Sequence, residues 1–210
     1  MAKIAPFEKF SEEYDEWFVS NKDKYEAELR ALNYFIPPNS KGLEVGVGSG
    51  KFADPLGIKT GVEPSQKMAV KARKLGIRVL AGVAEDLPFS NGTFDYILMV
   101  TTICFVDDLK KTFQEAFRVL KEEGIIVIGF IDKDSELGEK YRANKDKSRF
   151  YKMAEFFSAE EVLACLRETG FESFEAKQII FPGNDTQRIE DGFGTGSFVV
   201  MKGLKINKAR

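Results

Sequence analysis

The sequence predicts an α/β fold: a doubly wound, mostly parallel sheet of seven strands with a helical cover at its N-terminus. From residue 41 onward, short apolar runs alternate with amphipathic stretches, the pattern of repeated βα units. The amphipathic stretches carry recognisable helix caps, and the first forty residues show helical periodicity. We therefore expect a single domain over residues 1–210, with a helical cover (1–40) and an α/β core (41–210).

Seven apolar runs are the expected strands. The first five lie between residues 43 and 131, and the last two lie near the end of the chain: Leu43–Gly46, Ile58–Val62, Val79–Gly82, Phe94–Val100, Ile125–Ile131, Phe171–Phe181 and Ser197–Met201. Between them, Ser65 and Asp108 stand where helix N-caps belong, and Ser158 with Glu161 forms a capping box.

The first forty residues predict two helices. Aromatic residues spaced by three, four and three positions define one face of the first helix, and four apolar residues define the second: Phe7, Phe10, Tyr14 and Trp17, then Tyr25, Leu29, Leu32 and Ile36. Pro37 and Pro38 are expected to end the second helix.

Composition excludes several kinds of chemistry. The chain has no histidine, which rules out histidine-based triads, zinc sites and general bases, and its two cysteines make a structural metal site improbable, so no metal is expected. A net charge of −2 argues against nucleic-acid binding. There is neither an apolar run long enough for a membrane helix nor an N-terminal secretion signal, so we expect no membrane partner and a cytoplasmic location.

The segment from Leu43 to Gly50 predicts a ligand site where the first strand turns into a helix. Glycines there let the backbone approach a ligand closely. Glu44 is a carboxylate in an apolar strand, which favours a cationic partner. Glu63 ends the next strand, where an acidic residue can accept both hydroxyls of a ribose.

These segments resemble the class I S-adenosylmethionine-dependent methyltransferases, in particular the small-molecule group that includes the ubiquinone and menaquinone methyltransferases. Five blocks match in order, across roughly residues 14–171: Leu43–Gly50, Gly61–Ser65, Ala84–Phe89, Phe94-Asp95, and Arg118–Lys121 before Gly124. The resemblance implies a Rossmann-like methyltransferase fold, S-adenosylmethionine as the cofactor, and methyl transfer to a small-molecule acceptor by in-line displacement.

The resemblance also implies roles for individual residues. Glu44 would meet the methionine amino group, and Gly46, Gly48 and Ser49 would approach the carboxylate and ribose by their backbone. Glu63 would hold the ribose hydroxyls. Val83 and Ala84 would flank the adenine edge. Val100 and Thr101 would form the floor beneath the sulfonium.

Five residues are candidates for contact with the acceptor. The family's N-terminal helices commonly cover the acceptor pocket, which brings in Tyr14, Trp17 and Phe18, while Thr102 and Tyr141 can orient an acceptor by hydrogen bonding. The sequence singles out no catalytic residue. Many relatives carry a histidine pair where this chain has Cys104-Phe105, and Asp or Asn where it has Val83.

Several alternatives stay open at this stage. A dinucleotide dehydrogenase needs G-x-G-x-x-G, whereas this chain has G-x-G-x-G. A non-catalytic S-adenosylmethionine-binding sensor is the second hypothesis. The basic run 140–149 borders the expected pocket and would favour an anionic acceptor, and the glycines of 192–196 predict a hairpin loop. The acceptor, the atom methylated and the oligomeric state are not specified.

Overall fold

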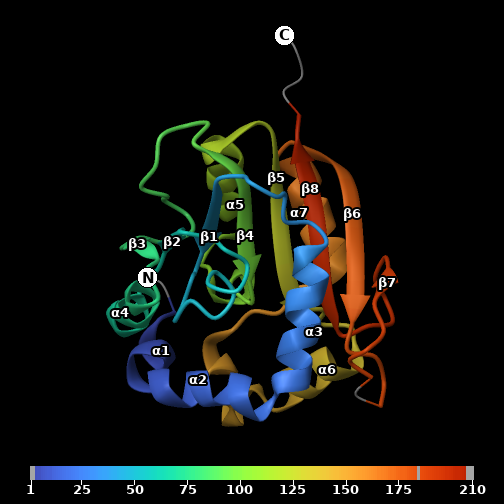
Figure 1. Cartoon of the computed structure of the whole chain (residues 1–210). Helices are drawn as coiled ribbons and strands as arrows, with labels where there is room; N and C mark the ends of the chain where they lie inside the picture. The colour runs from blue at the N-terminus through green and yellow to red at the C-terminus, as the bar shows by residue number, and fades with distance from the viewer. Residues whose placement is uncertain (1–2, 184, 207–210) are drawn as a thin grey trace.

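The computed structural model describes residues 3–183 and 185–206, which form a sheet of eight strands flanked by helices (Figure 1). The strand order is β3-β2-β1-β4-β5-β8-β6-β7. Neighbours from β3 to β5 run parallel, and β8 is antiparallel to both β5 and β6. The strands are β1 (Gly42–Val45), β2 (Thr60–Val62), β3 (Arg78–Leu80), β4 (Phe94–Val100), β5 (Leu120–Ile131), β6 (Phe171–Ile179), β7 (Glu190–Asp191) and β8 (Phe198–Lys205).

All seven expected strands are present, so the predicted mostly parallel sheet is confirmed. The eighth strand, β7, has two residues and pairs with Lys177 and Gln178 of β6. It was missed because two residues are too few to show a period of two. The loop 192–196 belongs to the connection between β6 and β8, which pair antiparallel as a hairpin requires, and β7 interrupts that connection. Gln178 holds this loop by accepting the backbone N–H groups of Thr195 and Gly196.

Helices cover both faces of the sheet. On one face, α5 (Leu109–Val119) and α7 (Ala159–Glu168) pack together, and on the other lie α3 (Lys22–Asn33) and α4 (Gln66–Lys74). The side chains of β1 divide accordingly: Leu43 and Val45 enter the α5–α7 layer, and Glu44 points into the other. The predicted caps are confirmed at Ser65, Asp108 and Ser158, the last within a complete capping box.

The N-terminal segment forms three helices, where the sequence predicted two. They are α1 (Ala5–Lys9), α2 (Ser11–Ser20) and α3. The expected first helix is interrupted because Phe10 leaves the helical region, with φ −123° and ψ 37°. Asn21 has a similar conformation and separates α2 from α3, which ends at Asn33 before reaching Ile36.

The turn after β1 also differs from expectation. No helix follows the glycines. Residues 47–57 form successive turns. Backbone hydrogen bonds such as that from the N–H of Asp54 to the carbonyl of Gly50 do not repeat along the segment as they would in a helix. Pro55 has no backbone N–H to extend such a ladder, and Gly57 has a positive φ of 73°, so a regular helix cannot propagate here.

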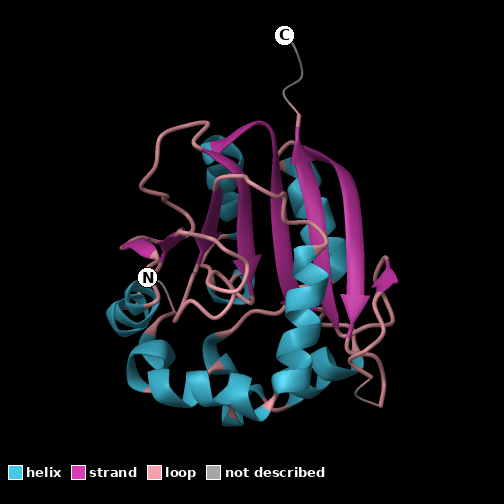
Figure 2. Cartoon of the chain, in the orientation of Figure 1, coloured by secondary structure: helices cyan, strands magenta, loops and turns pink. Residues whose placement is uncertain are grey.

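Short helices gather beyond the carboxyl ends of the parallel strands (Figure 2). α1 and α2 lie across this edge of the sheet together with α6 (Glu136–Ala143) and the 3₁₀ turns η1 (Ile103–Phe105), η2 (Lys145–Lys147) and η3 (Tyr151–Met153). Within residues 3–183 and 185–206, none of the helices has the length and hydropathy needed to cross a bilayer.

Candidate cofactor and acceptor site

A cavity opens at the carboxyl ends of β1, β2 and β4, bounded on its other side by α1, α2 and the segment 137–151. Of the nine residues predicted to bind the cofactor, seven line this cavity: Gly46, Gly48, Glu63, Val83, Ala84, Val100 and Thr101. Glu44 and Ser49 are buried nearby but are not part of its wall. The five predicted acceptor contacts also line the cavity: Tyr14, Trp17, Phe18, Thr102 and Tyr141.

The glycine turn is shaped by backbone geometry that side chains disfavour. Gly46 and Gly48 have φ values of 72° and 55°, in the left-handed region. A Cβ on Gly46 would lie 2.6 Å from the side chain of Thr102, whereas one on Gly48 would meet its nearest atom, in Met68, at 3.5 Å. The turn is therefore held tightly against Thr102, just beyond β4, at Gly46, whereas at Gly48 it lines the cavity in ordinary van der Waals contact with Met68 and Tyr14.

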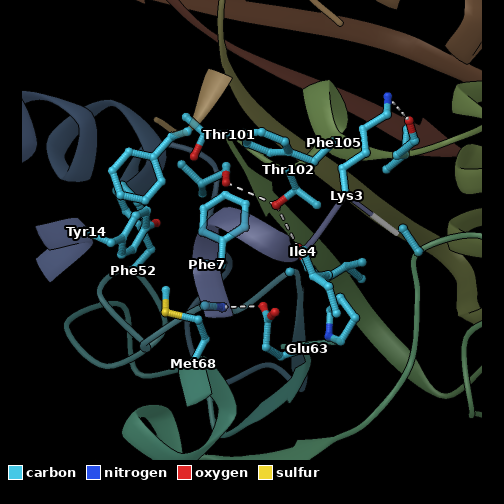
Figure 3. Close-up of a pocket in the computed structure, with 18 of the residues that line it drawn as sticks. Lys3, Ile4, Phe7, Tyr14, Phe52, Glu63, Met68, Thr101, Thr102 and Phe105 are labelled. Atoms are coloured by element: carbon cyan, nitrogen blue, oxygen red, sulfur yellow. Dashed lines mark hydrogen bonds between the residues drawn. The ribbon is translucent and has the colours of Figure 1, made fainter. Parts of the chain in front are cut away.

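Glu63 is fixed at the end of β2 by two backbone donors. One carboxylate oxygen accepts the N–H of Gly48 at 2.9 Å and the other that of Ser65 at 2.8 Å (Figure 3). Burial nevertheless raises the pKa of Glu63 to about 7, partly offset by these two bonds. Glu63 thus couples the glycine turn to the start of α4 and presents a hydrogen-bond acceptor to the cavity.

Glu44 carries an unsatisfied oxygen. Its side chain is 1% exposed, and Oε2 has no hydrogen-bond partner among the described residues. Burial and the nearby charge of Glu63 raise its pKa well above the usual range, and the Ala53 N–H opposes this. An orphaned carboxylate oxygen behind the glycine turn is the kind of defect that a ligand cation or ordered water relieves.

Ser49 has a structural partner. Its hydroxyl donates to Asp15 of α2 at 2.6 Å, and Asp15 also pairs with Lys71 of α4. The Ser49 side chain therefore ties the glycine turn to the N-terminal helices.

The end of β4 forms the floor of the cavity in a strained conformation. Thr101 has a φ of 49°, which is uncommon for a β-branched residue and is stabilised by its N–H bond to Gly129. The Thr102 hydroxyl lies 3.1 Å from the carbonyl oxygens of both Val45 and Val100. Backbone strain of this kind concentrates at functional sites.

Aromatic residues form a large part of the cavity wall, and one of them, Tyr14, lies beside Gly48. We call this group the aromatic cluster: Phe7, Tyr14, Phe105, Tyr141, Phe150 and Tyr151. Phe7 points into the cavity (Figure 3) and contacts Tyr14 and Phe105 in edge-to-face geometry. Sequence reasoning assigned acceptor contacts to two of the six. Phe150 and Tyr151 lie in a stretch without periodicity, so no sequence pattern marked them.

Short polar contacts fasten the N-terminal helices over this cavity. Glu8 of α1 accepts the Ser65 hydroxyl and the Lys67 N–H at the start of α4. Lys3 donates to the carbonyl of Val106. Lys71 of α4 pairs with Glu12 and Asp15 of α2. These contacts thus tie α1 and α2 to α4, whereas α3 packs against the sheet.

Comparisons with known proteins match this geometry. A methyltransferase-domain family model matches residues 43–128. The uncharacterized protein MJ1123 of Methanocaldococcus jannaschii is 46% identical over 203 residues, covering 95% of this chain and 98% of the relative. A ubiquinone/menaquinone biosynthesis C-methyltransferase of Rickettsia prowazekii is 30% identical and covers 74% of this chain and 68% of its own.

A solved structure agrees over nearly the whole chain. It is an S-adenosylmethionine-dependent methyltransferase of Thermotoga maritima, described as a possible histamine N-methyltransferase, with a TM-score of 0.92 and 46% identity over 96% of this chain and 99% of that one. This chain belongs to the class I S-adenosylmethionine-dependent methyltransferases. The dehydrogenase alternative is therefore wrong.

As a methyltransferase, the chain uses S-adenosylmethionine, and two features of the structure fit that cofactor. Gly48 lines the cavity in a left-handed conformation that puts its backbone at the wall, and Glu63 presents a buried hydrogen-bond acceptor beside it. The orphaned oxygen of Glu44 lies in the same region. The absence of histidine is compatible with methyl transfer, since the cofactor brings the reactive group.

Proposed function

We propose that this methyltransferase transfers the methyl group to a small molecule held against the aromatic cluster, by in-line displacement. The supporting observation is that one cavity joins the glycine turn and Glu63 to the aromatic wall. A nucleophile lying on that wall faces the cofactor side across a short, mostly apolar space. Holding two reactants in line in this way removes much of the barrier without any acid or base.

On the cofactor side, we propose that Glu63 accepts the ribose hydroxyls and that Gly46 and Gly48 approach the cofactor by their backbone. Val83 and Ala84 would flank adenine, with Val100 and Thr101 beneath the reacting centre. When bound, the cofactor supplies an electrophilic methyl group on a positively charged sulfur. The contact between Glu44 and the methionine amino group stays a prediction that needs a bridging water or a small movement, since Glu44 is not on the cavity wall.

On the acceptor side, Tyr14, Trp17, Phe18, Thr102 and Tyr141 retain their proposed contacts. Phe18 is 6% exposed and also packs into the core beside α3, so it has a structural role as well. We propose that residues 1–40 act as a cover that excludes water from the reacting centre. The relatives' names mention different acceptors, so the family does not fix this one.

The proposal includes a cytoplasmic protein that acts on small molecules rather than on nucleic acid. Both cysteines are free, with Cys104 buried, as expected in a reducing compartment.

Two measurements test the proposed function. Calorimetric titration should show S-adenosylhomocysteine binding, with NAD as the negative control. A metabolite library incubated with S-adenosylmethionine should then yield S-adenosylhomocysteine and a methylated product with at least one small molecule. Cofactor binding with no turnover on any acceptor would favour the sensor hypothesis instead.

A further inference from the structure

Glu28 of α3 is a buried carboxyl group that faces the cavity and has no use in the cofactor site. Its side chain is 4% exposed and lines the cavity wall. Among the described residues no hydrogen bond or ion pair within 4 Å involves Glu28, and Lys24 is the charge that acts on it. Unlike Oε2 of Glu44, the Glu28 oxygens are not closed off from the cavity. Burying a carboxylate without a partner is costly, and Ala27, Ala31 and Leu32 around it show that this part of α3 otherwise packs as an apolar surface.

The surroundings of Glu28 are aromatic. Its charge contributes to raising the pKa of Tyr14, Tyr141 and Tyr151, which places these three members of the aromatic cluster within its electrostatic reach. Tyr141 and Tyr151 are stacked, with ring centroids 5.0 Å apart. Aromatic faces attract cations, and a carboxylate attracts them more strongly.

The charges of the cavity favour a cation over an anion. Besides Glu28, the wall carries Glu63 and Glu85, against two lysines. Lys3 is bonded to the Val106 carbonyl, and Lys24, one helical turn before Glu28, lowers the pKa of Glu28 without forming an ion pair with it. The structure describes all of residues 140–149, and within this run Tyr141 lines the cavity while the basic residues do not. The expectation that this basic run favours an anionic acceptor is therefore wrong.

We propose that the acceptor of this methyltransferase is a small amine and that Glu28 binds its protonated amino group beside the aromatic cluster. This inference rests on the proposed function, because it names the class of molecule that the acceptor side of the same cavity takes. A neutral hydroxyl would give the Glu28 carboxylate one hydrogen bond but no compensating charge, and an anion would be repelled by the ionised carboxylate. An ammonium group supplies the missing hydrogen bonds and charge. Because a protonated nitrogen has no lone pair, the ammonium passes one proton to the Glu28 carboxylate before that nitrogen takes the methyl group.

Burial adds a pH signature. It raises the pKa of Glu28 to about 8, with Lys24 opposing the shift. The other titratable groups near Glu28 are Tyr14, Tyr25, Tyr141 and Tyr151, whose pKa values are raised and which stay neutral below pH 8. Because the ammonium binds the ionised carboxylate, its affinity should rise about tenfold between pH 6.5 and pH 8.

The test compares three probes that share a 2-phenylethyl group, on the full chain saturated with S-adenosylhomocysteine. They are 2-phenylethylamine, 2-phenylethanol and 3-phenylpropionate, and Trp17, the single tryptophan, reports binding by its fluorescence because it lines the cavity. At pH 8 the amine should bind about tenfold or more tightly than the alcohol, and the acid should bind most weakly. Glu28→Gln should abolish this preference and the rise with pH.

Glu26→Gln is the matched control. Glu26 lies on the same helix, is exposed and pairs with Lys22 at 3.6 Å, so its removal should leave the preference unchanged. Equal affinity for amine and alcohol, a preference that survives Glu28→Gln, or no binding of the amine would overturn the inference. The comparison of probes on the unaltered protein needs no variant to fold. Saturation with S-adenosylhomocysteine is established first by calorimetry, so failure of the cofactor site is recognised separately.

Discussion

The two sides of the cavity are built differently. The cofactor side consists of strand ends and a glycine turn, where backbone groups and Glu63 do the positioning. The acceptor side consists of side chains from two distant parts of the chain, the consecutive helices α1, α2 and α3 and the later elements η1, α6 and η3. A backbone-built site tolerates little change in shape, whereas a wall of side chains can be altered residue by residue. The difference explains how one fold can keep its cofactor while its acceptors vary.

The largest expected effect lies in the glycine turn. Gly46→Ala should lower the free energy of unfolding by about 2–5 kcal/mol, from left-handed strain plus the overlap with Thr102, and should strongly weaken cofactor binding. Gly57→Ala is the control, since Gly57 has a similar φ of 73° and open space around it, and should cost about 1–2 kcal/mol. Urea unfolding and calorimetry measure both effects. Equal losses in the two variants would show that the contact with Thr102 is unimportant.

The second prediction concerns the acceptor side and pH. Folding raises the pKa of Glu28 from 4.5 to about 8, so its contribution to stability is fully present below pH 4.5 and is lost as the pH rises toward 8. As the pH rises from 5 to 8, the free energy of unfolding of Glu28→Gln should therefore increase by about 3 kcal/mol relative to that of the unaltered protein. Unfolding curves in urea across this range give the difference. Parallel pH profiles for the two proteins would contradict it.

The third prediction returns to the cofactor side. Glu63→Ala should weaken S-adenosylhomocysteine binding by about 1.5–3 kcal/mol, the range for hydrogen bonds to a charged group. Because burial raises the pKa of Glu63 to about 7, affinity in the unaltered protein should rise between pH 6 and pH 8 as the carboxylate ionises. Glu85→Ala is the control: this residue also lines the cavity but accepts the backbone N–H groups of Asp107 and Asp108. An unchanged dissociation constant for Glu63→Ala would mean that the ribose is held elsewhere.

The smallest expected effect is spectroscopic and joins the two sides. Trp17 lines the cavity and contacts Phe18 with ring centroids 5.2 Å apart. Binding of S-adenosylhomocysteine should shift its emission if the cover adjusts to the cofactor. Phe7→Ala, which removes the ring between the cover and the cavity, should reduce the shift while leaving the sheet folded. A Trp17 emission spectrum that does not change when S-adenosylhomocysteine binds would mean that the cofactor side and the acceptor side of the cavity act independently.

Seven of the residues expected on the cofactor side line the cavity, and the sequence could bring them together because their determinants are contiguous. Gly46, Gly48 and Glu63 lie at strand ends within short motifs, and a strand end fixes where its residues point. Glu44 and Ser49 were placed in the same motif, but whether a side chain there faces the cavity depends on packing that a motif does not record. Glu28 was missed because a lone carboxylate on an amphipathic helix resembles a solvated residue. Its burial depends on α3 lying against the sheet.

The attachment of α1 and α2 to α4 has a consequence for turnover. Glu8 at the start of α4, and Lys71 with Glu12 and Asp15, connect the cover to the core by charged and polar contacts near the surface. Charges of this kind are screened within about 8 Å at physiological ionic strength. Added salt should therefore loosen the cover well before it affects the apolar sheet, and exchange of the spent cofactor should quicken with ionic strength. The rate at which the cavity opens would then respond to the medium while the chemistry inside it, shielded from solvent, does not.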